Sequence, residues 1–238
     1  MVEKMSRLLD DDFWLALPDN KALIDYGFAF DRFKFLMGDN EPFDPMARMS
    51  RDFCLHAVRN YYTAIFSFAV PSKELIAHLA TYSRNILEVG AGTGLWARLL
   101  KDYGCDVIAT DGEPVETRPQ SGSFTEVEAL DGAEAVARYP GRDLLCVWPY
   151  NDDPWLTHAI NNLHVGGSII FIGEGEETCG HPSFHAAISN RGCFEIVEQS
   201  RVPMFPHMHD RLMIARKTAP IPASIFRLTK TGRTDSSD

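Results

Sequence analysis

The chain has 238 residues, of which 45% are hydrophobic and 24% charged, a composition that excludes a disordered chain and favours a globular protein. Its 33 aspartates and glutamates outnumber 23 lysines and arginines, so the net charge at pH 7 is −10. This charge repels a phosphate backbone and disfavours nucleic acid as a partner.

Cysteine spacing and hydropathy indicate the compartment. The five cysteines are widely spaced and contain no C-x-x-C pair, so we expect free thiols in a reducing cytoplasm. The first residues carry an acidic cluster where a signal peptide is apolar, and no segment reaches the roughly 18 apolar residues of a membrane span. Cys179, His181 and His185 lack a fourth ligand at finger-like spacing, so we predict no metal site.

Residues 1–71 are predicted to form a helical cap. Apolar residues recur there every three or four positions, as on one face of a helix, and this face needs another surface to cover. Pro71 and Ser72 then end one helix and begin another, over residues 73–83. We therefore predict a cap over 1–71, a core domain over 72–217, and a tail over 218–238 whose polar end is disordered.

From residue 85 onward, strand patterns alternate with helix patterns. Two strand-like runs near the end, over 193–202 and 210–217, have no helix between them and predict an antiparallel hairpin. The remaining strands are apolar nearly throughout, which is typical of a parallel sheet covered on both faces. We predict a Rossmann-like, doubly wound, mostly parallel seven-stranded α/β sheet with an antiparallel last strand. The other predicted strands cover 85–90, 105–111, 124–130, 143–149 and 167–173, and the helices cover 95–104, 132–139 and 155–164.

The first strand runs into the sequence EVGAGTG, with glycines at 90, 92 and 94. A glycine-rich turn between a strand and a helix lets a ligand lie against the backbone and the helix N-terminus. The dinucleotide fingerprint G-x-G-x-x-G requires a glycine where this chain has Leu95. The alternating spacing, with Glu88 two residues before the first glycine, instead resembles the first motif of class I S-adenosylmethionine-dependent methyltransferases.

Two later acids extend the resemblance. Asp111 ends the next predicted strand, where its oxygens can accept the hydroxyl groups of a ribose, and Gly112 follows it. The segment VEALDGAEAV resembles the family's third segment, in which an acid meets the adenine amino group; Asp131 matches best, with Glu128 as the alternative. For S-adenosylmethionine as cofactor, the resemblance implies a binding set of Glu88 at the methionine end, Gly90, Ala91 and Gly92 under the methionine and ribose, Asp111, Gly112, Asp131 and Trp148.

The fourth strand ends in Trp148, Pro149 and Tyr150, which partly resemble the [DN]-P-P-[FY] motif of amino-group methyltransferases. Trp148 stands where that motif has a side-chain acceptor for the target amine, so adenine or glutamine methylation is not carried over. The chain is also similar to methyltransferase-like proteins with a strand ending in W-P and a later IGE segment. We expect Tyr150 to form an aromatic wall beside the sulfonium, and Asp152 and Glu174 to hold or deprotonate the acceptor.

The same residues also allow a purely structural interpretation. The Trp148 and Tyr150 rings are also typical of packing at a strand end, and the aspartates at 152 and 153 are typical helix caps. The resemblance implies a methyltransferase acting on a small molecule or an amine-bearing acceptor. Two alternatives remain, a catalytically inactive cofactor-binding module that binds a regulatory partner, and an NAD-dependent oxidoreductase of shared architecture.

Overall fold

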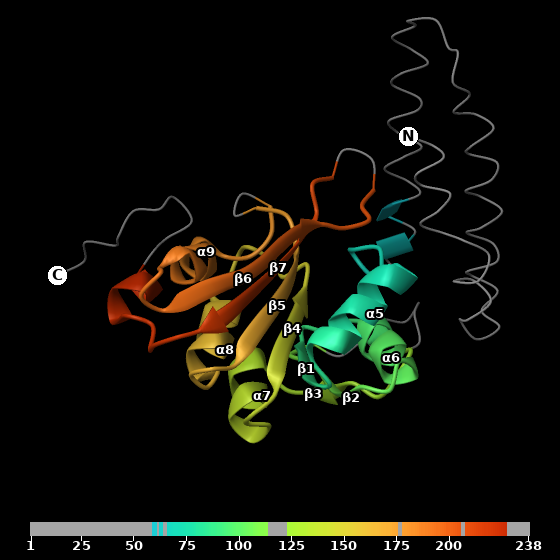
Figure 1. Cartoon of the computed structure of the whole chain (residues 1–238), viewed down its shortest axis with the longest axis horizontal. Helices are drawn as coiled ribbons and strands as arrows, with labels where there is room; N and C mark the ends of the chain where they lie inside the picture. Colours follow the sequence, from blue (N-terminus) through green and yellow to red (C-terminus); the bar gives the residue numbers. More distant parts are fainter. Residues whose placement is uncertain are drawn as a thin grey trace, which may run out of the picture.

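A computed structural model of the chain describes residues 59–60, 62–63, 66–113, 123–175, 178–205 and 208–227. These form a seven-stranded sheet of order β3-β2-β1-β4-β5-β7-β6 (Figure 1). The strands are β1 Asn85–Val89, β2 Asp106–Asp111, β3 Glu128–Ala129, β4 Asp143–Val147, β5 Ser168–Gly173, β6 Phe194–Arg201 and β7 Arg211–Lys217. The helices are α5 Lys73–Tyr82, α6 Leu95–Asp102, α7 Gly132–Arg138, α8 Trp155–Asn162, α9 Pro182–Ser189 and the 3₁₀ helix η2 Ala223–Arg227.

The strand directions confirm the predicted fold class. β1 to β5 run parallel, whereas β7 is antiparallel to both of its neighbours, β5 and β6. The second strand of the final hairpin therefore enters the sheet beside β5, and β6 forms the edge. Because β7 runs backwards, its first residue, Arg211, pairs with Gly173 at the end of β5. The chain segment before β7 thus lies at the edge of the sheet where the parallel strands end.

Different helices pack on the two faces of the sheet. Alternate strand residues point to opposite faces, so Ile86 and Leu145 join one buried cluster, whereas Leu87 and Leu144 join the other. Helices α5 and α6 cover the first face, and α7, α8 and α9 cover the second (Figure 1). This is the covering on both faces that the apolar strands predicted.

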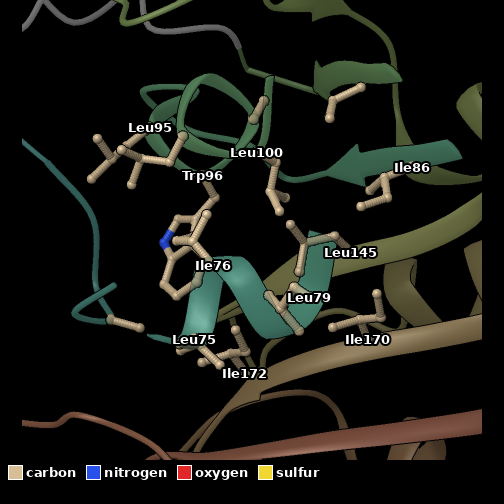
Figure 2. Packing of buried hydrophobic residues seen from close by; sticks show 14 of the residues in the cluster. Leu75, Ile76, Leu79, Ile86, Leu95, Trp96, Leu100, Leu145, Ile170 and Ile172 are labelled. Carbon is tan, nitrogen blue, oxygen red and sulfur yellow. The ribbon is translucent and has the colours of Figure 1, made fainter. Parts of the chain in front are cut away.

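Helix α5 begins where the sequence predicted and ends at Tyr82, one residue earlier than predicted. The Ser72 side chain accepts a hydrogen bond from the Leu75 backbone N–H at 3.2 Å, which satisfies a free donor in the first turn. Ile76 and Leu79 are buried on one face of this helix. Figure 2 shows them beside Trp96 of α6 and Leu145 of β4, respectively, so α5 packs on the sheet and on α6 together.

Two predicted elements differ from the structure. The strand expected over 124–130 is only Glu128–Ala129, because the Phe124 backbone N–H donates to the Thr93 carbonyl at 2.8 Å instead of pairing with β2. The segment after β5, expected to be a loop, contains helix α9. His181 caps that helix through its side chain, and Pro182 occupies the first turn, where a missing N–H costs nothing.

Part of the predicted cap lies in the described chain. Tyr62 and Phe66 belong to the α5–α6 cluster, and the Tyr62 ring lies 5.2 Å from that of Phe205. The Thr93 hydroxyl donates to the Phe66 carbonyl, which joins this segment to the glycine loop. Residues 1–58 and 228–238 lie outside the described residues, and the division into cap, core and tail stays a prediction. Among the described residues, none of the helices has the length and apolar character needed to cross a membrane.

A buried lysine joins β7 to the end of α8. The Lys217 side-chain nitrogen donates to the carbonyls of Ile160, Asn161 and Leu163 at 3.0, 2.7 and 2.8 Å. These are carbonyls at the C-terminus of the helix, which have no partner within it, and a positive charge there also interacts favourably with the helix dipole.

Replacing this lysine is expected to weaken the whole domain. Lys217→Met leaves buried carbonyls without a donor and should lower the free energy of unfolding by about 1–3 kcal/mol. Urea unfolding followed by circular dichroism measures this change. Lys101→Met is the matched control, because the hydrogen bond that Lys101 donates goes to the half-buried Thr125 hydroxyl rather than to helix carbonyls. Equal losses in the two variants would contradict the capping role of Lys217.

Candidate functional site

A cavity of about 510 Å³ opens at the edge of the sheet where β1, β2 and β4 end. This is the edge at which open α/β sheets bind ligands, and the volume suits a nucleoside-sized molecule. The lining residues come from the loops after these strands, from the starts of α7 and α8, and from Phe68. They are Phe68, Gly90, Gly92, Asp111, Gly112, Glu113, Asp131, Gly132, Val147, Trp148, Pro149, Tyr150, Asp153 and Trp155.

The three glycines of the loop serve different purposes. All have positive φ, but a Cβ on Gly90 would lie 3.0 Å from the Trp155 ring, and one on Gly94 would lie 3.0 Å from Thr125 and Val127. A Cβ on Gly92 would meet no atom within 4 Å. Gly90 and Gly94 are therefore required by packing, whereas Gly92 leaves its backbone open to the cavity.

Glu88 supports the loop from below. Gly94 caps α6 without a side chain, and the buried Glu88 carboxylate accepts a 2.8 Å hydrogen bond from the Ala97 N–H in its place. Burial raises the pKa of Glu88 to about 8, against the lowering effect of the Ala97 bond; the nearby Asp111 charge raises it further. Glu88 does not line the cavity. Its role at the methionine end of the cofactor, expected from the sequence, stays a prediction.

Asp111 joins the ends of β1 and β2. One oxygen accepts the Gly92 N–H at 2.7 Å and the other accepts the Glu113 N–H at 2.8 Å. Each carboxylate oxygen has a further lone pair, so this fixed side chain, which lines the cavity, is still able to accept hydroxyl groups.

The structure separates the two candidates for the adenine-facing acid. Asp131 lines the cavity and caps α7, where one oxygen accepts the N–H groups of Ala133 and Glu134. Glu128 lies outside the lining, and its carboxylate accepts the Tyr139 hydroxyl at 2.6 Å. Asp131 is therefore the acid of the third segment that is placed to meet a ligand.

Aromatic rings form one wall of the cavity. Phe68 stacks on Trp148 at 5.9 Å between ring centroids and meets Tyr150 edge-on at 6.2 Å. The Trp155 ring lies against the glycine loop, where it packs on Gly90, and it also packs on Gly132. The Tyr150 ring is 62% exposed, so it remains free to cover a ligand.

The three predicted catalytic residues lie in different places. Tyr150 lines the cavity; Asp152 is exposed beside the lining residue Asp153, which accepts the Trp155 N–H at the start of α8. Glu174 follows β5 outside the lining, and its carboxylate accepts the His209 backbone N–H at 2.5 Å. The structure therefore brings only Tyr150 into the lining of the cavity. Residues 176 and 177, the other glutamates of this loop, lie outside the described residues.

The histidines and cysteines have structural contacts. His181 caps α9, and the His185 ring nitrogen lies 2.7 Å from the Cys179 carbonyl oxygen. In the described part of the chain, no group of three metal-ligating side chains comes together.

Sequence reasoning missed Phe68, Trp155 and Asp210. Trp155 comes two residues after Asp153, in the segment that follows the fourth strand, and this position was a signal for a site residue. Phe68 precedes the core, and Asp210 comes 62 residues after Trp148, so neither carries a local signal. Asp210 accepts the Trp148 indole N–H at 2.7 Å, and burial raises its pKa to about 6, opposed by that hydrogen bond.

Neither a protein-family model nor a curated protein matches this sequence. Among solved structures, the chain is similar to magnesium protoporphyrin IX methyltransferase from Synechocystis PCC 6803 with bound S-adenosylmethionine, at 14% identity and a TM-score of 0.44 over 85% of this chain and 99% of that one. It is also similar to 1,6-didemethyltoxoflavin-N1-methyltransferase from Burkholderia thailandensis with bound S-adenosylhomocysteine, at 19% identity and a TM-score of 0.42 over 76% and 94%.

A third similar structure is a putative tRNA (m1A22) methyltransferase from Streptococcus pneumoniae, at 15% identity and a TM-score of 0.44 over 66% of this chain and 76% of that one. At these sequence identities and TM-scores the similarity to the solved structures is distant. The strand order and directions show a Rossmann-like, mostly parallel seven-stranded fold.

Glu88 should make stability depend on pH. The folded protein keeps the Glu88 proton up to about pH 8, whereas the unfolded chain releases it near the ordinary pKa of 4.5. The free energy of unfolding should therefore fall as pH rises from 4.5 to 8, with a contribution of roughly 2–5 kcal/mol from this residue. Glu88→Gln, which keeps an acceptor for Ala97, should remove this part of the slope in urea unfolding at several pH values. An unchanged slope in the variant would contradict the assignment.

Proposed function

We propose that this protein is an S-adenosylmethionine-dependent methyltransferase acting on a small molecule or an amine-bearing acceptor. The observation that carries the proposal is the charge of the cavity. Its described lining contains four acids and no lysine, arginine or histidine. S-adenosylmethionine carries a sulfonium and an ammonium group against a single carboxylate, so its net positive charge suits this lining. The acids are Asp111, Glu113, Asp131 and Asp153.

The same features disfavour a nicotinamide dinucleotide. A pyrophosphate needs free N–H groups at a glycine loop and at the start of the following helix. Here the Gly92 and Ala97 N–H groups already donate to carboxylates, and the Gly94 N–H donates to the Ala91 carbonyl. A dinucleotide would therefore place its negative charge beside the Asp111 carboxylate, with few free N–H donors to compensate for it.

The residue roles follow from this placement. Asp111, held by its two backbone bonds, accepts the ribose hydroxyls, and Asp131 accepts the adenine amino group through its oxygen that does not cap α7. Gly90, Ala91 and Gly92 lie under the cofactor. The remaining members of the proposed binding set are Gly112 and Trp148 in the cavity lining, and Glu88, which acts through α6 and the loop.

Methyl transfer from a sulfonium is an in-line displacement, so the protein mainly aligns the acceptor and receives its proton. The Tyr150 ring, with Phe68 beside it, offers an electron-rich face to the sulfonium and the acceptor. Asp152 and Glu174 remain the proposed proton acceptors. Asp152 is the sequence neighbour of Asp153, which lines the cavity. When bound, the cofactor supplies the methyl group.

A second candidate is a module that binds the cofactor without turnover. It is favoured by Trp148, which occupies the position of an amine-accepting side chain and whose indole N–H is already bonded to Asp210. Both candidates predict cofactor binding, so only turnover separates them. Incubating the protein and fractionated cell extract with radiolabelled S-adenosylmethionine should transfer label into an extract component. Absence of transfer from a protein that binds the cofactor would favour the module.

Cofactor binding is tested by calorimetry. S-adenosylmethionine and S-adenosylhomocysteine should bind the wild-type protein, and NAD should not. Gly92→Arg fills the one loop position that opens to the cavity and should weaken binding by at least about 100-fold, or about 2.7 kcal/mol.

Gly141→Arg provides the matched control for this substitution. Gly141 also has positive φ and open space around its position, but it lies in the turn before β4, at the opposite edge of the sheet. The control should share the backbone strain of Gly92→Arg and retain binding. A wild-type protein that binds neither S-adenosyl compound would overturn the proposed function.

A further inference from the structure

Trp148 holds an unusual conformation at the end of β4. Its φ is +53°, in the left-handed region that bulky residues rarely adopt, and such strain persists only where surrounding contacts determine it. Its backbone N–H continues the sheet by donating to the Ile172 carbonyl at 2.8 Å. The indole stacks on Phe68 and carries the Arg59 guanidinium 5.1 Å from its ring centroid. The ring lines the cavity on one side, so its orientation shapes that wall.

Asp210 holds the nitrogen of this indole. It precedes β7, is 1% exposed, and accepts the Trp148 Nε1–H through Oδ1 at 2.7 Å. Its other oxygen, Oδ2, is buried and has no hydrogen-bond partner in the structure as described. A buried carboxylate costs free energy, and a single bond to an indole offsets only part of it. This cost indicates a purpose other than stability.

We propose that Asp210 is a positioning residue, whose carboxylate holds the Trp148 indole in the cavity wall and thereby sets the affinity for S-adenosyl ligands. This inference takes the identity of the ligand, and nothing else, from the proposed function. Asp210 itself does not line the cavity, so it acts through Trp148. Its place depends on β7 running antiparallel, which brings the segment before this strand to the end of β4 and β5.

The charge of Asp210 should make the indole sensitive to pH. The groups that act on its ionisation are Arg59 from the N-terminal segment, Glu174 after β5, and the adjacent His209; the buried Cys179 thiol also lies close enough to feel its charge. Burial and Glu174 raise the pKa of Asp210, whereas the Trp148 bond, Arg59 and His209 lower it, with the balance at about 6. A charged acceptor holds an indole N–H more strongly than a neutral one. Lowering the pH through 6 should therefore loosen the indole.

The first readout is tryptophan fluorescence of the protein without ligand, titrated from pH 4.5 to 8. The wild-type protein should show a transition near pH 6 that disappears in Trp148→Phe, Asp210→Asn and Asp210→Leu. His209→Gln should keep the transition, which separates Asp210 from the neighbouring histidine. A transition that persists in Asp210→Asn, or is lost in His209→Gln, would overturn the proposal.

The second readout is the affinity for S-adenosylhomocysteine at pH 7.5. Asp210→Asn still accepts the indole N–H and should bind within about threefold of the wild type, whereas Asp210→Leu should bind about tenfold or more weakly. Asp143→Leu is the matched control, because Asp143 also accepts a hydrogen bond, from the Ser168 N–H, at the opposite end of β4. This control should bind normally. Normal binding by Asp210→Leu, or equal losses in Asp210→Asn and Asp210→Leu, would overturn the proposal.

Two further outcomes are distinguishable. If Asp210→Leu does not fold, Trp148→Phe, which removes the indole N–H, should reproduce its loss of affinity, and wild-type affinity in that variant would overturn the proposal. If the wild-type protein does not bind S-adenosylhomocysteine, the proposed function fails, and with it the role in affinity. The fluorescence titration still decides whether Asp210 holds the indole.

Discussion

The hydrogen bond from the Gly92 N–H to the Asp111 carboxylate is the contact on which the candidate site depends. It joins the loops that follow β1 and β2, which are neighbours in the sheet, so the cavity floor is anchored to two adjacent strands. The Glu88 carboxylate then holds the start of α6 under the same loop. These two acids occupy N–H groups that a phosphate-binding loop leaves free, and the Asp111 carboxylate adds negative charge at the loop. The proposal that the cavity binds a cationic cofactor rests on this difference.

Buried carboxylates recur around the site. Glu88 and Asp210 are both about 1% exposed, and burial raises the pKa of each. Such groups cost free energy that an apolar residue of similar size would not cost. Glu88 holds the first turn of α6, which follows the glycine loop, and Asp210 holds the Trp148 ring, which lines the cavity. The free-energy cost of burying these two acids is consistent with a ligand-binding site, since proteins tolerate such costs at functional sites.

Local patterns accounted for most of the fold. Within each of β1, β2, β4 and β5 the apolar residues follow one another along the chain, and the Ser72 cap adjoins α5, so short-range preferences set these elements. The strand predicted over 124–130 failed because its residues pack on Gly94 and Thr93 rather than extending along β2. Helix α9 was missed because its cap is a histidine, which is rarely a capping residue.

The sequence by itself determined the strand, the glycine loop and the acid after the next strand, because these follow one another along the chain and parallel strands bring their ends to one edge. Only the tertiary structure decided which acids reach the cavity, choosing Asp131 over Glu128. It also decided that Glu88 supports the loop from below and that Asp210 meets Trp148. The reason is physical, since these contacts join segments that are distant in sequence, and their directions depend on sheet order and helix packing.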